Sequence, residues 1–201
     1  MSRAGRRVIG WCGVIGLLCM VSACGMVLVP DASQGGRVDV TARRVTKEDK
    51  GVQVTVQSMA WQYEPYDLDN LYTPLLVFVR NETDQPIPLQ YRDFVLVDDR
   101  GTQYDVVPPQ TAEFTARSRL PRYAPSYAAP YGYGAVPPPF LYNNGRATDI
   151  TLLGLTETSV RPHAQVRGFL YFQQAMMEGR RLTLTVSLAG HPQEFQFSIQ
   201  R

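Results

Sequence analysis

Few residues of this sequence are of types that could carry out covalent or acid–base chemistry. The chain has 201 residues, with three cysteines and two histidines. All the cysteines lie within the first 24 residues: Cys12, Cys19 and Cys24. The rest of the chain can therefore form neither a disulfide nor a cysteine metal site. His163 and His191 each stand beside a proline in a turn-forming stretch, and the sequence names no partner carboxylate for them, so we interpret both as exposed turn residues.

The carboxylates offer little more. Asp67 and Asp69 have the first spacing of a calcium loop, but Leu71 stands where the third oxygen ligand should be, so a polar loop is the preferred interpretation and calcium the alternative. The Asp98-Asp99 pair precedes Gly101, which is typical of a tight turn. The sequence contains no nucleophile elbow, zinc-binding helix motif or phosphate loop. We therefore predict no catalytic residue, no metal, no cofactor and no enzymatic activity.

One cysteine has an informative neighbourhood. Arg3, Arg6 and Arg7 precede an uncharged, largely apolar run over 8–29, which is the layout of an export signal. Within this run Val21-Ser22-Ala23-Cys24 resembles the lipobox of bacterial lipoproteins.

The lipobox resemblance implies a defined processing step. It implies cleavage between Ala23 and Cys24, so that 1–23 is a signal peptide, and attachment of diacylglycerol and further acyl chains such as palmitate to Cys24. Two or three such chains would hold the protein on a membrane, because each buried methylene contributes about 0.8 kcal/mol. Gly25 after the cysteine favours an outer over an inner membrane.

An uncleaved signal anchor is the alternative. The 22 residues of the run could cross a hydrocarbon core of about 30 Å as a helix. In both cases the arginines stay on the cytoplasmic side. Either way we expect the folded part to lie in the cell envelope and to face the periplasm or the exterior.

Charge excludes one class of partner. From Cys24 onward the chain holds 17 Arg and Lys against 18 Asp and Glu, so it lacks the basic surface that nucleic-acid binding requires. With 44% hydrophobic residues the chain is long enough to bury one full core.

The remaining pattern predicts strands. Residues 24–37 are expected to form the lipidated N-terminus and a polar tether. From 38 onward, short runs with a period of two predict strands over 52–56, 73–80, 93–97, 103–107, 148–153, 166–172, 182–188 and 194–199, and no segment has clear helical periodicity. The prediction is an all-β fold over 38–201, an antiparallel sandwich of seven to nine strands.

One segment interrupts this pattern. Residues 120–142 are rich in proline and tyrosine and cannot pair in a sheet, so they are predicted to form a surface insertion. Its tyrosines offer rigid faces and hydroxyls suited to contact with a protein, a glycan or peptidoglycan; a passive loop is the alternative. The candidate contact residues are Tyr123, Tyr127, Tyr131 and Tyr133.

Two further groups of residues are considered as sites. Arg117, Arg119 and Arg122 make a weak basic patch beside the insertion. Trp61 and its neighbours are expected to pack in the core.

Taken together, the strands resemble the immunoglobulin-like β-sandwich lipoproteins of bacteria, a group that includes telokin-like domains. The resemblance is carried by 75–87, 92–104 and 160–172, and His163-Ala164 stands where that group often has a glycine after the proline. These are strand and turn signals, so they imply a fold and no activity. The expected function is a non-catalytic, membrane-anchored structural or binding component of the envelope. An accessory subunit or assembly factor of an envelope complex is the first alternative, and a cell-wall-acting enzyme is the second.

Overall fold

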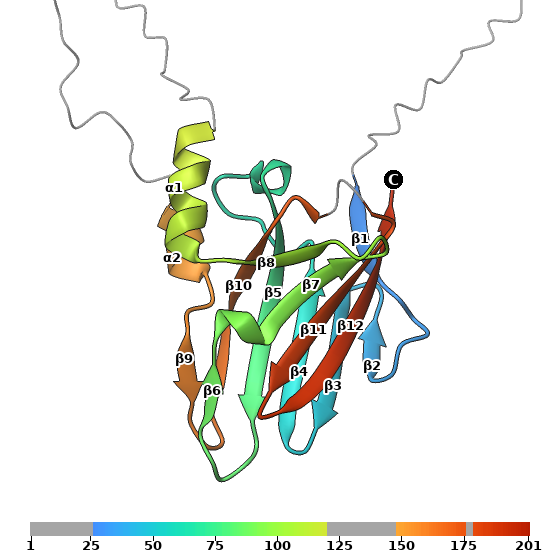
Figure 1. The fold of residues 1–201 in the computed structure, drawn as a ribbon, viewed down its shortest axis with the longest axis vertical. Helices are drawn as coiled ribbons and strands as arrows, with labels where there is room; N and C mark the ends of the chain where they lie inside the picture. The colour runs from blue at the N-terminus through green and yellow to red at the C-terminus, as the bar shows by residue number, and fades with distance from the viewer. Residues whose placement is uncertain (1–25, 120–147, 176–178) are drawn as a thin grey trace, which may run out of the picture.

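The computed structural model describes residues 26–119, 148–175 and 179–201 (Figure 1). The described residues are mainly β-structure, as predicted, with two short α-helices and two 3-10 turns. The strands are β1 (Val27–Pro30), β2 (Arg37–Asp39), β3 (Arg44–Asp49), β4 (Val52–Ser58), β5 (Tyr72–Asn81), β6 (Ile87–Leu89), β7 (Phe94–Asp98), β8 (Gln103–Val107), β9 (Thr158–Val160), β10 (Gln165–Gln173), β11 (Arg181–Leu188) and β12 (His191–Gln200). The helices are α1 (Pro109–Arg119) and α2 (Thr148–Leu153), and the 3-10 turns are η1 (Leu68–Asn70) and η2 (Tyr91–Asp93).

Ten of these strands form one antiparallel sheet, and β6 pairs with β9 separately. The order is β1-β12-β11-β7-β8-β10-β5-β4-β3-β2. The sheet folds over at β8, whose first residues pair with β7 while Val106 and Val107 pair with β10. As a result β11 and β12 lie in front of β3 and β4 (Figure 1).

The first strand of this order, β1, also comes close to β4 near the other edge of the sheet. The hydroxyl of Ser58 in β4 donates a hydrogen bond to the carbonyl of Leu28 in β1 at 2.6 Å, and residues 31–36 connect β1 directly to β2. The sheet is therefore nearly closed.

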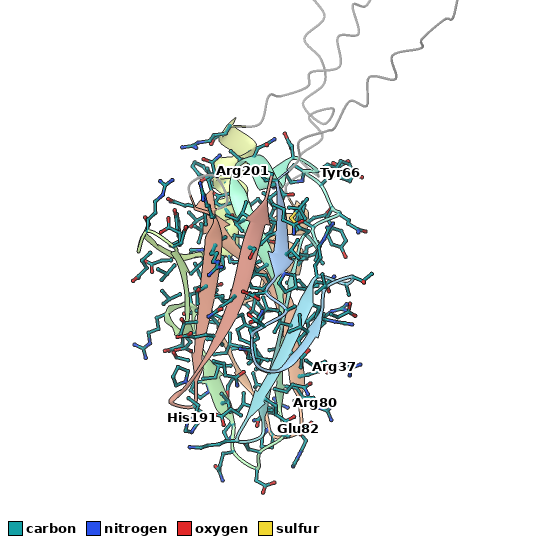
Figure 2. All side chains as sticks on the ribbon, turned by 90° about the vertical axis from the view of Figure 1, so that its right-hand side faces the viewer. Arg37, Tyr66, Arg80, Glu82, His191 and Arg201 are labelled. Atoms are coloured by element: carbon teal, nitrogen blue, oxygen red, sulfur yellow. The ribbon has the colours of Figure 1, made fainter. Side chains whose placement is uncertain are left out.

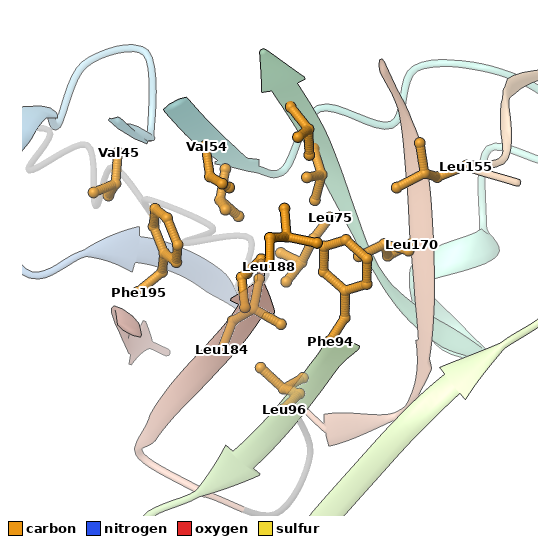
Figure 3. Close-up of a cluster of buried hydrophobic side chains, with 14 of the residues drawn as sticks. Val45, Val54, Leu75, Phe94, Leu96, Leu155, Leu170, Leu184, Leu188 and Phe195 are labelled. Atoms are coloured by element: carbon orange, nitrogen blue, oxygen red, sulfur yellow. The ribbon is translucent and has the colours of Figure 1, made fainter. Parts of the chain in front are cut away.

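Alternating side chains fill the space between the two halves. Val54 and Leu75 from one half meet Phe94, Leu184 and Phe195 from the other, and each of them is essentially inaccessible to solvent (Figure 3). The period of two that predicted these strands is the consequence of this one-sided burial.

The number of strands and their grouping differ from the prediction. Seven to nine strands in an immunoglobulin-like sandwich were expected, whereas the described residues form twelve strands, ten of them in one continuous sheet. The reason is β8, which links the two layers through its own hydrogen bonds. A period of two reports which side of a strand is buried, but not which strand lies next to it.

The tether predicted over 24–37 is too long. Val27–Pro30 forms β1, because its backbone pairs with β12 and the Leu28 side chain is only 1% exposed. In the sequence this strand is hidden at the end of the apolar run.

Two helices were also missed. α1 buries Pro109, Ala112 and Ala116, which are spaced as one helical face but are too small to produce a clear hydrophobic pattern. Residues 148–153, predicted as a strand, form α2, in which Ile150 is buried and Leu152 is 73% exposed. No helix among the described residues is long and apolar enough to span a membrane.

The Asp98-Asp99 turn agrees with the prediction. Gly101 has a φ of +85°, and one carboxylate oxygen of Asp98 accepts hydrogen bonds from the backbone N–H groups of Arg100 at 2.9 Å and Thr102 at 2.8 Å. The hydroxyl of Tyr104 donates to the other oxygen at 3.1 Å. Desolvation alone would raise the pKa of Asp98, but these hydrogen bonds outweigh it and lower the pKa below its usual value.

This arrangement predicts a specific loss of stability in acid. A carboxyl whose pKa is lowered by folding stabilises the fold above its ordinary pKa of about 3.9, and the contribution is lost as the pH falls through the lower, folded value. We expect the free energy of unfolding to fall below about pH 4, and to fall less in Asp98→Asn. Urea unfolding between pH 2 and 6 measures both. An unchanged pH dependence in the variant would contradict this role for Asp98.

Candidate functional site on the concave outer face

The outer face of the half-sheet formed by β2, β3, β4, β5 and β10 has two regions with different surroundings. Toward one end, residues 59–71 and the helices α1 and α2 cover it. Toward the other end the strands are open to solvent, and side chains from β2 to β5 and β10 line a shallow depression of about 710 Å³. This depression, which we call the concave face, is the candidate functional site.

The covered region is a second hydrophobic core. Trp61 is 8% exposed, donates its indole N–H to the carbonyl of Pro65 at 2.9 Å and packs edge-on against the ring of Phe169. The hydroxyl of Tyr171 donates to the carbonyl of Ile150 in α2 at 2.9 Å, and burial raises the pKa of this tyrosine far above its usual value. These aromatic side chains are packing groups, as predicted for Trp61, and their polar atoms are already bonded within the protein.

A glycine allows α2 and the segment after it to approach the sheet. The backbone N–H of Leu155 donates to the carbonyl of Phe169 in β10 at 2.8 Å. A Cβ atom at Gly168 would lie 2.5 Å from the nitrogen of Leu155, too close for any side chain. The covered region therefore ends at Gly168, and the concave face begins beyond it.

Cross-strand pairing sets the polar floor of the concave face. The outward residues of β3 and β4 face one another, and the hydroxyls of Thr46 and Thr55 lie 2.9 Å apart. In the next strand Phe78 stands opposite Thr55, and Arg80 stands between Gln53 and Gln165. Hydroxyl, amide and guanidinium groups thus surround one partly exposed aromatic ring.

The charges of the concave face are mixed and lie near solvent. Arg44 approaches Asp39 at 3.9 Å, and Arg80 pairs with Glu82 at 3.1 Å. Such exposed ion pairs contribute little to stability. Arg37, at the edge strand β2, is exposed and has no ion-pair partner among the described side chains.

The concave face offers hydrogen-bonding groups around one aromatic ring and no cluster of catalytic side chains among the described residues. An aromatic ring flanked by amides, hydroxyls and guanidinium groups can hold an extended polar ligand through one apolar face and many hydrogen bonds. No sequence motif marked these residues, because they are ordinary outward positions on strands. The only available signal was a run of Thr, Gln and Arg on the non-core side of 44–57.

The two histidines lie at the end of the sheet away from α1, His163 in the turn between β9 and β10 and His191 at the start of β12. The sequence named no partner for either, yet each has a carboxylate nearby. His163 Nε2 lies 3.2 Å from an oxygen of Asp84, with both side chains exposed. His191 Nδ1 lies 3.9 Å from an oxygen of Asp49 and is partly buried. Within the described residues no three His, Cys, Asp or Glu side chains converge as metal ligands would.

The two aspartates with the calcium-loop spacing do not converge with a third potential metal ligand among the described residues. Asp67 and Asp69 flank Leu68, whose side chain is fully buried in the second core and is part of η1. Both aspartates are exposed on the surface around it.

Other predicted site residues lie outside the described part of the chain. These are Ala23, Cys24, Tyr123, Tyr127, Tyr131, Tyr133 and Arg122. Of the predicted basic patch, Arg117 pairs with Glu113 on α1, and Arg119 is exposed at the end of that helix.

No protein-family model matches the chain, and no curated protein matches it. Among solved structures it is similar to ycdA, a proposed lipoprotein from Bacillus subtilis subsp. subtilis str. 168, with 13% identity and a TM-score of 0.44. That comparison covers 76% of this chain and 38% of the other, so the chain spans well under half the length of ycdA. It is also similar to the yjhA protein from Bacillus subtilis, with 12% identity, a TM-score of 0.40 and coverage of 71% and 76%. Both TM-scores lie below 0.5, and neither likeness bears on the function of this chain.

Two phenylalanines on the same face test the division into a covered and an open region. Phe169→Ala empties a site in the second core, and we expect it to lower the free energy of unfolding by about 3–5 kcal/mol. Phe78→Ala removes a ring that lies at the solvent boundary, and we expect a loss of about 1 kcal/mol. Denaturant unfolding measures both changes. A loss at Phe78 as large as that at Phe169 would mean that Phe78 serves the fold and is not available for contact.

Proposed function

We propose that this protein is a lipid-anchored lipoprotein of the bacterial cell envelope, which faces the periplasm or the exterior and acts as a non-catalytic structural or binding component. One observation carries the proposal. The Val21-Ser22-Ala23-Cys24 motif ends an export signal, and the first strand of the folded body begins at Val27, three residues after the cysteine. Cleavage before Cys24 would leave every strand of the described residues joined to an acylated residue.

The position of β1 also limits the segment that an uncleaved anchor could use. β1 takes Val27 and the residues after it out of the apolar run, which leaves 19 residues over 8–26. At 1.5 Å per residue these span about 28 Å, close to a hydrocarbon core of about 30 Å, so an anchor helix would have to run directly into β1. The lipidated cysteine supplies the membrane attachment without such a helix.

The concave face supports a binding role. It is open, polar and built on rigid strands, and its side chains are not needed to fill either core. An envelope protein or a cell-wall glycan with exposed hydroxyl and amide groups fits this chemistry. The tyrosines of 120–142 remain a second proposed contact surface.

An accessory subunit is the second candidate function, and the position of β2 favours it. This strand ends the ten-stranded sheet, pairs only with β3 and borders the concave face. An extended segment of a partner could add to this edge, with its side chains over the concave face.

Replacement of the cysteine tests the anchor. In Cys24→Ser the thioether cannot form, so we expect the protein to leave the membrane fraction or to accumulate as uncut precursor. Mass spectrometry of the N-terminal peptide and fractionation of membranes measure this. Cys19→Ser, five residues earlier in the signal, is the matched control and should be processed and retained normally. An unmodified thiol on Cys24 in membrane-bound wild-type protein would refute the proposal.

Two variants separate the proposed contact surfaces. We expect deletion of 121–142 to reduce the recovery of a chemically cross-linked partner after mild detergent extraction, and the double charge reversal Arg37→Glu/Arg80→Glu to reduce it as well. Arg92→Glu, a reversal in η2 outside the concave face, is the control and should leave recovery unchanged. Near-ultraviolet circular dichroism checks that each variant is folded. Unchanged recovery in a folded variant rules out the surface altered in that variant.

A further inference from the structure

The link between the proposed lipid and the folded body is very short. Only Gly25 and Met26 separate Cys24 from Val27, the first residue of β1. A fully extended chain advances at most about 3.3–3.6 Å per residue, so Val27 can lie no farther than about 11 Å from the modified cysteine. Val27 pairs with Gln200, which places the end of β12 beside it.

The body is much longer than this link. Tyr66 and Arg201 lie at the end where β1 begins, and Glu82 and His191 lie at the opposite end (Figure 2). The ten residues of β12 run between these ends, a length of about 33 Å at 3.3 Å per residue. We call them the tethered end and the far end.

Exposed apolar side chains gather toward the tethered end. Five large hydrophobic side chains are exposed among the described residues, and the three most exposed are Tyr66 at 75%, Phe114 at 74% and Leu152 at 73%. They lie on the segment before η1 and on α1 and α2, in the upper part of the molecule in Figure 1. Tyrosine and phenylalanine rings are well suited to the boundary between lipid head groups and acyl chains.

None of these five exposed hydrophobic side chains lies in the turns of the far end. Asp49, Lys50, Glu82 and Asp84 lie in or beside the turns of this end, together with both histidines. Removing these groups from water would be costly, so this end favours the aqueous phase.

From the length of the link and this asymmetry, we propose that the tethered end rests on the membrane surface, with Tyr66 and Phe114 at the lipid head groups, and that the far end projects away from the membrane. The inference rests on the proposed lipidation of Cys24. It places the concave face upright beside the membrane, where a ligand in the aqueous layer can reach it.

Site-specific fluorescence tests the orientation. Residues 25–201 contain no cysteine, so a single introduced cysteine can be labelled without background once Cys24 is acylated. Tyr66→Cys and Phe114→Cys report on the tethered end, and Glu82→Cys and Asp84→Cys on the far end. Each acylated, labelled protein is placed in phosphatidylethanolamine and phosphatidylglycerol vesicles that carry a quencher on the lipid head group.

We expect severalfold stronger quenching at the two tethered-end positions than at the two far-end positions. Insertion of twelve Gly and Ser residues between Gly25 and Met26 would allow a separation of about 19 Å, and the difference between the ends should shrink. Equal quenching at all four positions, or stronger quenching at the far end, in protein that sediments with the vesicles would overturn the orientation and leave the lipid anchor intact. An unmodified Cys24 in the mass spectrum would instead refute the lipid anchor and the orientation together.

Discussion

The hydrogen bonding of β8 to two different neighbours determines the architecture. Because its first residues pair with β7 and its last residues with β10, the chain cannot separate into two independent sheets. The sheet must fold over on itself, and the side chains of both halves then fill a common core. The edge strand β1 meets β4 where Ser58 donates to the carbonyl of Leu28, which makes β1 part of the fold. That position of β1 brings the folded body to within three residues of Cys24.

The same closure leaves one long outer face, which is covered at one end and open to solvent at the other. Near α1 and α2 this face is buried in a second core, where Trp61, Phe169 and Tyr171 pack together and the polar atoms of the first and last are satisfied. Farther along the same strands the described residues leave the sheet open, and the outward positions are polar except for Phe78. A stable second core beside an open polar surface holds the strands of the concave face in a fixed register, which is the condition a binding surface needs.

A partly buried charged group, Lys47, lies at the seam between the halves. Lys47 in β3 lies with its ammonium 5.6 Å from the centre of the Phe195 ring in β12, and desolvation lowers the pKa of this lysine despite the opposing effect of Glu194. A lysine can occupy this position because its methylene chain packs on apolar neighbours while its charge meets the face of an aromatic ring. Contact across this seam is made by side chains, and strand pairing is confined to the rest of the sheet.

The sequence by itself determined the β-rich class, the position of most strands, the Asp98 turn and the lipobox-like motif, because each of these depends on neighbouring residues: alternation, turn chemistry or a short motif. It did not reveal α1, whose buried face consists of Pro109 and two alanines, nor the strand β1, whose residues also read as the end of an apolar run. The partners of His163 and His191 and the whole concave face were equally hidden, since they join residues far apart in the chain. Strand order, the fold-over at β8 and the division of the outer face came only from the tertiary structure, because hydrogen bonding between strands depends on which segments meet in space, and a local pattern of burial is compatible with many such arrangements.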